Sequence, residues 1–569
     1  MSTRMQDAPV VVIRRLATYT DSASLVKLAA TCRWMWLQVR DQRDNWWHRF
    51  HAEYPREDDR HMAWLRWYIR RTTATAKIDA GTAALGPRSL DWFQAYRWRC
   101  ATEMRWFGGG EQYRLITDAP LADEHQQQQQ YRVLQRILVE RSTLSECAYL
   151  EQCQSANDPR EDPVWHRRRL HYVNMSPHLV EVWRLRMSGS FIVAAVRSTR
   201  RRPAGEANDA DILVWPTHQA HRTRPHRVPG CWGSAFSLRD HWLLVSGAAA
   251  ASTGSAHTTR IYNLHTRKWC SGSIEGSKVS AFFQRTDRRT ALVVHADVDR
   301  KRATTTTTTT TKGPGGVLQV LTWSVWRFDA HAAPKRDAQC LATGSCHMPR
   351  FVNNDAPIRR IDDRRALLCG VNTRASFAST GRRSRRNNNA TATANEDDGN
   401  GNGNGNGEDA MAPITVGVLH NAGIDDPFTR TAAMMPTWSQ LIEAKEFVPL
   451  IVPQQLLVLH PQAWSILDLN TGALLRRIET QALDEQLSRF HWNGIARQQL
   501  DAGALADACV VTTNKKGNLL VVDLVRTDRA RVLDMPESSA SYGTPVLHGG
   551  SANALVVEVG DKYVIVDAA

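Results

Sequence analysis

Residues that could bind a metal ion are thinly spread along this 569-residue chain. The densest group is Cys340 followed by the adjacent pair Cys346-His347. Structural zinc takes four ligands, usually from two closely spaced pairs, and no second pair accompanies this group. The ten cysteines include no CxxC pair, which also argues against a disulfide framework. The sequence therefore predicts reduced thiols, no metal site and no cofactor.

The motifs of common hydrolases and nucleotide-binding enzymes are absent. The chain contains no GxSxG, HExxH or GxxxxGK[ST] sequence, and the run Gly108-Gly109-Gly110 lacks the strand-then-helix context of a phosphate loop. Its twenty histidines occur singly, without a nearby acid or nucleophile in a recognisable pattern. We expect no catalytic residue, and a hydrolase with a dispersed site is the weakest alternative.

Arginine carries most of the net charge of +15. The runs at 167–169, 200–202 and 382–386 could bind nucleic acid or an acidic partner. They could equally be solvated loops, because no aromatic stacking pattern or nucleic-acid motif accompanies them. We expect a protein partner, and an arginine-rich nucleic-acid-binding protein is an alternative.

The segment from Ala8 to Trp47 has the spacing of short amphipathic helices. Apolar residues recur at intervals of three and four, first in Val12, Ile13 and Leu16 and then in Leu25 and Leu28. This pattern predicts a small helical bundle that keeps an apolar face for a partner.

The same segment resembles the F-box, the module that joins substrate receptors to cullin-type (SCF) ubiquitin ligases. Pro9 matches the family's opening Leu-Pro, and Cys32-Arg33 matches the Cys-Arg before its central tryptophan. The family's Leu, Glu and Asp are replaced at Ala8, Val11 and Ser24, so the match is degenerate. The resemblance implies that the adaptor-binding residues are Pro9, Val12, Ile13, Leu16, Leu25, Leu28, Cys32, Trp34, Trp36 and Trp46. The alternative is a bundle that only packs on the rest of the protein.

Residues 56–175 have the composition of an aromatic-rich helical spacer. Trp92 with Tyr96, and Trp106 followed by Gly108, resemble the spacer helices that follow the module in F-box receptors. Spacings of three and four in Val133, Leu134, Ile137, Leu138 and Leu144 predict a further helix.

From residue 176 the pattern changes to short strands separated by turn residues. Strand pairs joined by turns of the Asn-Thr-Gly type recur every forty to fifty-five residues or so, a period typical of β-propeller blades. This part resembles the WD-repeat family loosely, because ILVW, IYNL, ILDL and VVDL keep only its hydrophobic frame. We expect about seven degenerate blades, with six or eight as the nearest alternatives, and low-complexity insertions near 300–316 and 380–412. A β-sandwich or a stack of unrelated sheets is the alternative.

Together these observations predict a multidomain chain, α followed by all-β. It comprises an F-box-like domain (1–55), a helical spacer (56–175) and a WD-repeat-like β-propeller (176–569). The resemblance implies a substrate receptor that binds the small adaptor and cullin of a ubiquitin ligase and holds an unknown client protein. A propeller scaffold without ligase activity is the alternative. Basic residues expected at turns could receive an acidic or phosphorylated client segment, and they are Arg239, Arg260, Arg267, Arg359 and Arg360.

The sequence shows no membrane-spanning segment and no signal peptide, so we expect an intracellular protein of the cytoplasm or nucleus. The arginine-rich composition with threonine, glutamine and Asn-Gly tracts would suit the GC-rich genome of a protist or a large DNA virus. A viral protein of this kind would act in the host cell.

Overall fold

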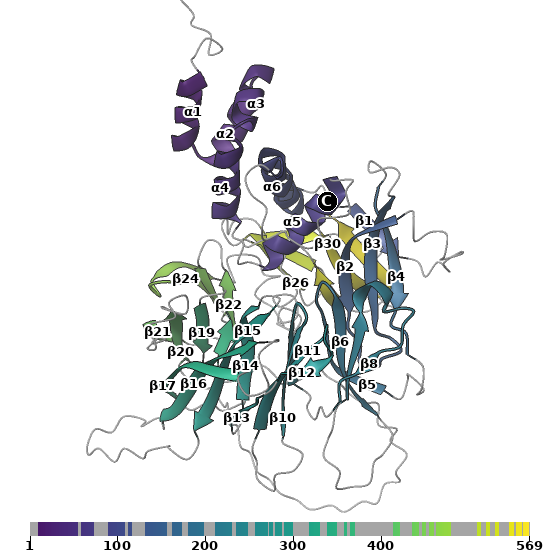
Figure 1. The fold of residues 1–569 in the computed structure, drawn as a ribbon. Coiled ribbons are helices and arrows are strands. Elements are labelled where there is room, and N and C mark those ends of the chain that lie inside the picture. Colours follow the sequence, from purple (N-terminus) through teal and green to yellow (C-terminus); the bar gives the residue numbers. More distant parts are fainter. Residues whose placement is uncertain are drawn as a thin grey trace, which may run out of the picture.

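The chain folds as a helical region followed by antiparallel sheets (Figure 1). The structure is a computed structural model that describes residues 10–54, 59–72, 89–108, 112–116, 131–155, 162–172, 180–198, 211–229, 235–248, 257–270, 272–276, 279–286, 289–299, 318–329, 338–349, 358–360, 365–369, 414–420, 435–442, 446–450, 455–459, 463–479, 509–513, 519–523, 530–533, 546–550, 554–559 and 562–567. The expected insertions near 300–316 and 380–412 lie outside these ranges, as do the arginine runs at 200–202 and 382–386.

The expected N-terminal helices are present. They are α1 (Val10–Tyr19), α2 (Ser22–Ala29), α3 (Arg33–Arg40), α4 (Arg43–Glu53), α5 (Asp59–Thr72) and α6 (Trp92–Gly108). Local capping explains where two of them begin. The Asp21 carboxylate accepts the Ser24 N–H at 2.8 Å before α2, and Cys32 Sγ accepts the Met35 N–H at 3.5 Å before α3.

Eight antiparallel sheets occur in the described part of the chain. The first holds β2 (Tyr131–Val139), β3 (Ala148–Ser155) and β4 (Val164–Arg169), and the second holds β5 (Val180–Met187), β6 (Phe191–Ser198), β7 (Asp211–Pro216) and β8 (His226–Arg227). The third holds β9 (Ala235–Arg239), β10 (Trp242–Ala248), β11 (His257–Asn263), β12 (Lys268–Trp269) and β13 (Ile274–Gly276). The fourth holds β14 (Val279–Thr286), β15 (Thr290–Asp299), β16 (Leu318–Asp329) and β17 (Ala338–Pro349).

The remaining sheets follow in the same chain order. The fifth holds β18 (Ile358–Arg360), β19 (Arg365–Cys369), β20 (Ile414–His420) and β21 (Met435–Ile442), and the sixth holds β22 (Glu446–Leu450), β23 (Gln455–Leu459), β24 (Ala463–Asp468) and β25 (Leu474–Glu479). The seventh holds β26 (Cys509–Thr513), β27 (Leu519–Asp523) and β28 (Ala530–Leu533). The closing sheet holds β29 (Val546–Gly550), β30 (Ala554–Val559), β31 (Lys562–Asp567) and the distant β1 (Gln112–Ile116).

The sheets are arranged as a β-propeller. Successive sheets approach through their first strands, with β29 against β2, β5 against β9, β9 against β14 and β14 against β18. Apolar clusters fill the space between neighbouring sheets, and β1 pairs with β31, which joins the start of the all-β part to its end. This pairing completes the closing sheet with a strand from the start of the all-β part, and so closes the ring.

The all-β part begins earlier than the sequence analysis expects, and this accounts for the difference in blade number. Strands start at Gln112 rather than near residue 176, so the expected helical spacer contributes the whole first sheet. The described strands form eight sheets where seven blades were expected.

The predicted helix over residues 133–144 is wrong, because this segment contains strand β2. A β-bulge between Val133 and Gln135 shifts the register, so the buried residues Leu134 and Ile137 are three apart instead of two or four. The bulge therefore imitates helical spacing in the sequence. Similar register shifts occur in the first strands β5, β14 and β29.

The expected tight turns are present and repeat in detail. In the turn between β24 and β25, Asp468 Oδ1 accepts the Asn470 and Thr471 N–H groups at 2.9 and 2.7 Å. These hydrogen bonds outweigh the opposing effect of desolvation and lower the pKa of Asp468. In the turn between β11 and β12, Asn263 Oδ1 accepts the N–H groups of the two equivalent residues, each at 3.0 Å. The last residue of both turns has positive φ, 73° at Gly472 and 54° at Arg267.

We expect opposite results from exchanging the residues at this last turn position. Arg267→Gly relieves a left-handed backbone that disfavours a side chain and should raise the free energy of unfolding by about 0.5 kcal/mol. Gly472→Ala imposes the same conformation on a Cβ and should lower it by about 1 kcal/mol. Urea unfolding followed by tryptophan fluorescence measures both changes. A destabilising Arg267→Gly would contradict the proposed equivalence of the two turns.

Candidate functional site

The ten predicted adaptor-binding residues divide into an outward and an inward set. Val12 and Leu16 on α1 are exposed, with 49% and 40% of their surface accessible. Ile13, Leu25 and Trp46 are buried, whereas Leu28, Cys32, Trp34 and Trp36 are half-buried and Pro9 lies outside the described residues. The structure therefore brings only part of the predicted set to the surface.

The outward part is an apolar stripe along α1, defined by Val12, Leu16 and Tyr19. These residues are four and three positions apart, so they lie on one side of the helix. A neighbouring side of the helix packs inward through Ile13 and Ala17. Tyr19 has 83% of its surface exposed, and the sequence analysis missed it. Its distance of seven residues from Val12 was the available signal.

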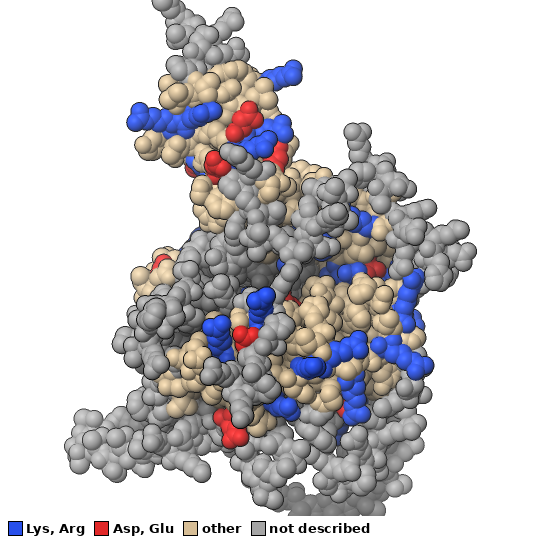
Figure 2. Space-filling view, in the orientation of Figure 1, with Lys and Arg blue, Asp and Glu red and all other residues tan. Residues whose placement is uncertain are grey.

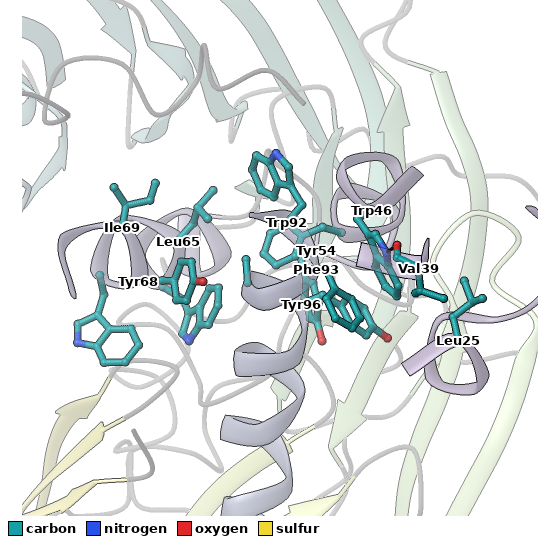
Figure 3. Close-up of a cluster of buried hydrophobic side chains, with 14 of the residues drawn as sticks. Leu25, Val39, Trp46, Tyr54, Leu65, Tyr68, Ile69, Trp92, Phe93 and Tyr96 are labelled. Carbon is teal, nitrogen blue, oxygen red and sulfur yellow. Dashed lines mark hydrogen bonds between the residues drawn. The ribbon is translucent and has the colours of Figure 1, made fainter. Parts of the chain in front are cut away.

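Of the inward set, Leu25 and Trp46 belong to one core that extends through all six helices. Side chains from α2, α3 and α4 meet those of α5 and α6 in a single cluster (Figure 3), and Ala17 of α1 and Leu134 of β2 join it. Trp46 packs against Phe93 and Tyr96, with ring centroids 5.0 and 5.3 Å apart. Its indole N–H donates to the Val39 carbonyl at 2.7 Å. Trp46 therefore supports the bundle from inside.

Two other predicted contact residues also have local roles. Trp36 meets Phe93 edge-on at 4.9 Å, and the Arg97 guanidinium lies over its ring at 4.5 Å. The Cys32 thiol caps α3, as described above. The matches to the resembled family at these positions thus coincide with residues that hold the helices together.

Polar contacts fix the orientation of α1 within the bundle. The Arg49 guanidinium of α4 donates to the carbonyls of Ala17 and Thr20 at 2.5 and 2.6 Å. Its positive charge there interacts favourably with the negative end of the α1 dipole. The Glu53 carboxylate accepts the hydroxyls of Ser22 and Tyr96 at 2.6 and 2.8 Å, and so links α2, α4 and α6. Burial, with neighbouring Cys100 and Glu53, raises the pKa of Tyr96, so its hydroxyl stays a donor. The stripe is therefore presented on an anchored helix.

Basic side chains gather over the sheets at the lower right of Figure 2, with few acidic side chains among them. Three of the arginines expected at turns belong to the third sheet. Arg239 ends β9 and Arg267 lies in the turn after β11, which places both at the same end of that sheet. The expectation that Arg260 lies at a turn is wrong, because it lies within β11, with its guanidinium 4.3 Å from the Trp269 ring centroid. Arg359 and Arg360 lie on β18, outside the residues with described side chains.

The arginine run at 167–169 is largely used within the fold. Arg168, with Arg136, flanks the buried Glu151 carboxylate at 3.3 and 2.7 Å. The Arg167 guanidinium covers the Tyr563 ring of the closing sheet at 4.7 Å. Two of these three charges thus stabilise strand packing.

The cysteines and histidine that were weighed as metal ligands, and not expected to bind a metal, lie along one strand. Cys340, Cys346 and His347 all lie on the one extended strand β17, where about 3.3 Å per residue separates the two cysteines by roughly 20 Å. Among the residues that the structure describes, no three metal-ligating side chains form a group. No helix in the described ranges is long and apolar enough to cross a bilayer.

Thiol reactivity should follow burial. Desolvation raises the pKa of Cys147 and of Cys153 to about 12, and that of Cys100 to about 11, so these thiols are protonated at pH 7.5. We expect iodoacetamide to modify exposed Cys340 well before these three, as read by peptide mass spectrometry. Modification of Cys147 or Cys153 at the rate of Cys340 in the folded protein would contradict the described packing.

No family model and no curated protein sequence matches the chain. Among solved structures, BamB from Moraxella catarrhalis is similar at 6% identity and a TM-score of 0.32, over 77% of this chain and 99% of that one. The AfRom2 CNH domain is similar at 10% identity and a TM-score of 0.30, over 68% of this chain and 94% of that domain. These values define no family, so the fold assignment depends on the strand topology of the chain itself.

Proposed function

We propose that this chain is the substrate-recognition subunit of a cullin-type ubiquitin ligase. The observation that carries the proposal is the exposed stripe Val12, Leu16 and Tyr19 on α1, within the segment that resembles an F-box. Burying these side chains against the small adaptor removes apolar surface from water, at about 25 cal/mol per Å². Other subunits would carry out ubiquitin transfer, and this chain would hold the client close to them.

The shared helical core supports this role. A receptor has to hold its client at a defined distance from the transferring enzyme, which requires the adaptor-binding helices to be rigidly joined to the client-binding part. The single cluster from α1 to β2 provides such a joint. In Figure 1, α1 and α3 lie far from the sheets, where an adaptor could approach them.

For the client, we propose an acidic or phosphorylated segment bound at the turns of the propeller. Arg239 and Arg267 at one end of the third sheet have the charge that such a segment requires. A scaffold without ligase partners is the rival function. It differs in predicting no adaptor binding by the stripe.

A surface substitution tests the proposal better than deletion of residues 1–55. The deletion would uncover Trp92, Phe93 and Tyr96, which pack against α4, and loss of binding could then reflect loss of folding. Substitution within the exposed stripe leaves this core unchanged.

We expect Leu16→Glu to weaken binding of the purified adaptor to the full chain by about tenfold or more, because a charge replaces buried apolar surface. Met104→Glu is the matched control, since Met104 is an apolar residue of α6 with 73% of its surface exposed. Binding is measured by pull-down and biolayer interferometry, and circular dichroism confirms folding. Equal binding by wild type, Leu16→Glu and Met104→Glu would refute the stripe as the adaptor site.

A further inference from the structure

A buried chain of hydrogen bonds connects the helical region to the strand that closes the ring. The Trp67 indole N–H of α5 donates to Gln152 Oε1 at 2.9 Å, and Gln152 Nε2 donates to Asp567 Oδ2 at 3.3 Å. Trp67, Gln152 and Asp567 are all buried, and they belong to α5, the first sheet and the closing sheet. This series of hydrogen bonds therefore crosses the junction of three parts of the fold.

The chemistry of the two ends fixes the middle residue. An indole N–H can only donate and a carboxylate can only accept, so the Gln152 amide has one orientation that satisfies both. Gln135 Nε2 donates to the same Oε1 at 2.8 Å, which adds a second donor on the correct side. Leucine or methionine at position 152 could fill the space but could not connect Trp67 to Asp567.

The junction that these hydrogen bonds span is the one that closes the propeller. Asp567 is paired with Gln112, the first residue of β1, and only residues 109–111 separate β1 from α6. The helical region is thus attached to the closing sheet twice, covalently through α6 and by hydrogen bonds through α5.

Other contacts reinforce the same junction. Arg70 of α5 donates to the Leu134 carbonyl of β2 at 3.2 Å, and Arg141 forms an ion pair with the buried Glu558 of β30. The apolar cluster between the first and closing sheets includes Ile137, Leu150, Val556 and Ile565.

We infer that α5 stabilises the closure of the ring, which is the pairing of β1 with β31. Gln152 is the positioning residue that couples α5 to β31. In this inference α5 and β31 open together, and loosening either one loosens the other. The inference concerns the free chain and holds whether or not the chain binds a ligase adaptor. A second consequence is that the helical region cannot swing freely relative to the closing sheet.

The test compares two matched tryptophans of α5 by hydrogen–deuterium exchange on the full chain. Trp67→Phe removes the indole donor and keeps an aromatic ring. Trp64→Phe makes the same change three residues earlier, where the buried indole N–H has no hydrogen-bond acceptor. We expect Trp67→Phe to speed exchange in both α5 and β31 by about tenfold, the size expected for one buried hydrogen bond. Trp64→Phe should change exchange in the helical region and leave β31 as in the wild type.

The reciprocal variant Gln152→Met perturbs the ring side. Because coupling is mutual, it should speed exchange in α5 as well as in β31. The inference is overturned if Trp67→Phe leaves β31 unchanged, if both tryptophan variants speed β31 equally, or if Gln152→Met leaves α5 unchanged. Retained adaptor binding in all three variants would leave the proposed function intact, so the two ideas fail separately.

Discussion

The structure depends most on the pairing of β1 with β31. Strands from the two ends of the all-β part share the closing sheet, and the strand from the start follows directly after the helical region. The helices therefore cannot be an independent appendage. Their position is set by the strand that they deliver to the ring, and the core shared between α5, α6 and β2 adds to this constraint.

This constraint also explains the distribution of aromatic residues. The tryptophans before residue 110 fill the space between short helices, where large rings supply most of the available apolar contact. With these rings turned inward, the apolar residues left outside on α1 stand out. An exposed stripe on an anchored helix is the property that a docking surface needs, because little conformational freedom is lost on binding.

Sequence reasoning succeeded where a pattern has one structural meaning. Helical spacing around Leu25 and the Asn-Thr-Gly turn at 470–472 predicted the local structures that are found. It failed at β2, because a bulge at Leu134 gives buried residues a spacing of three. The exchanged strand β1 could not be predicted either, because its partner lies about 450 residues away and local patterns carry no record of such pairing.

The candidate site was predicted only in part, for a related reason. A family pattern places residues at positions in the sequence but does not say which of them face inward in this chain. Leu16 and Val12 face outward as the resemblance implies, whereas Trp46 is buried and Trp36 packs against α6. Tyr19 is exposed beside them, although the resemblance implies no contact at this position.

The most direct test of adaptor binding is isothermal titration calorimetry of the purified ligase adaptor into the full chain at several temperatures. The account predicts saturable one-to-one binding with a negative heat-capacity change, as expected when an apolar stripe is buried. Saturable binding that persists without a heat-capacity change would argue for a polar contact elsewhere. The absence of any saturable heat, with the chain shown to be folded, would contradict the proposed function.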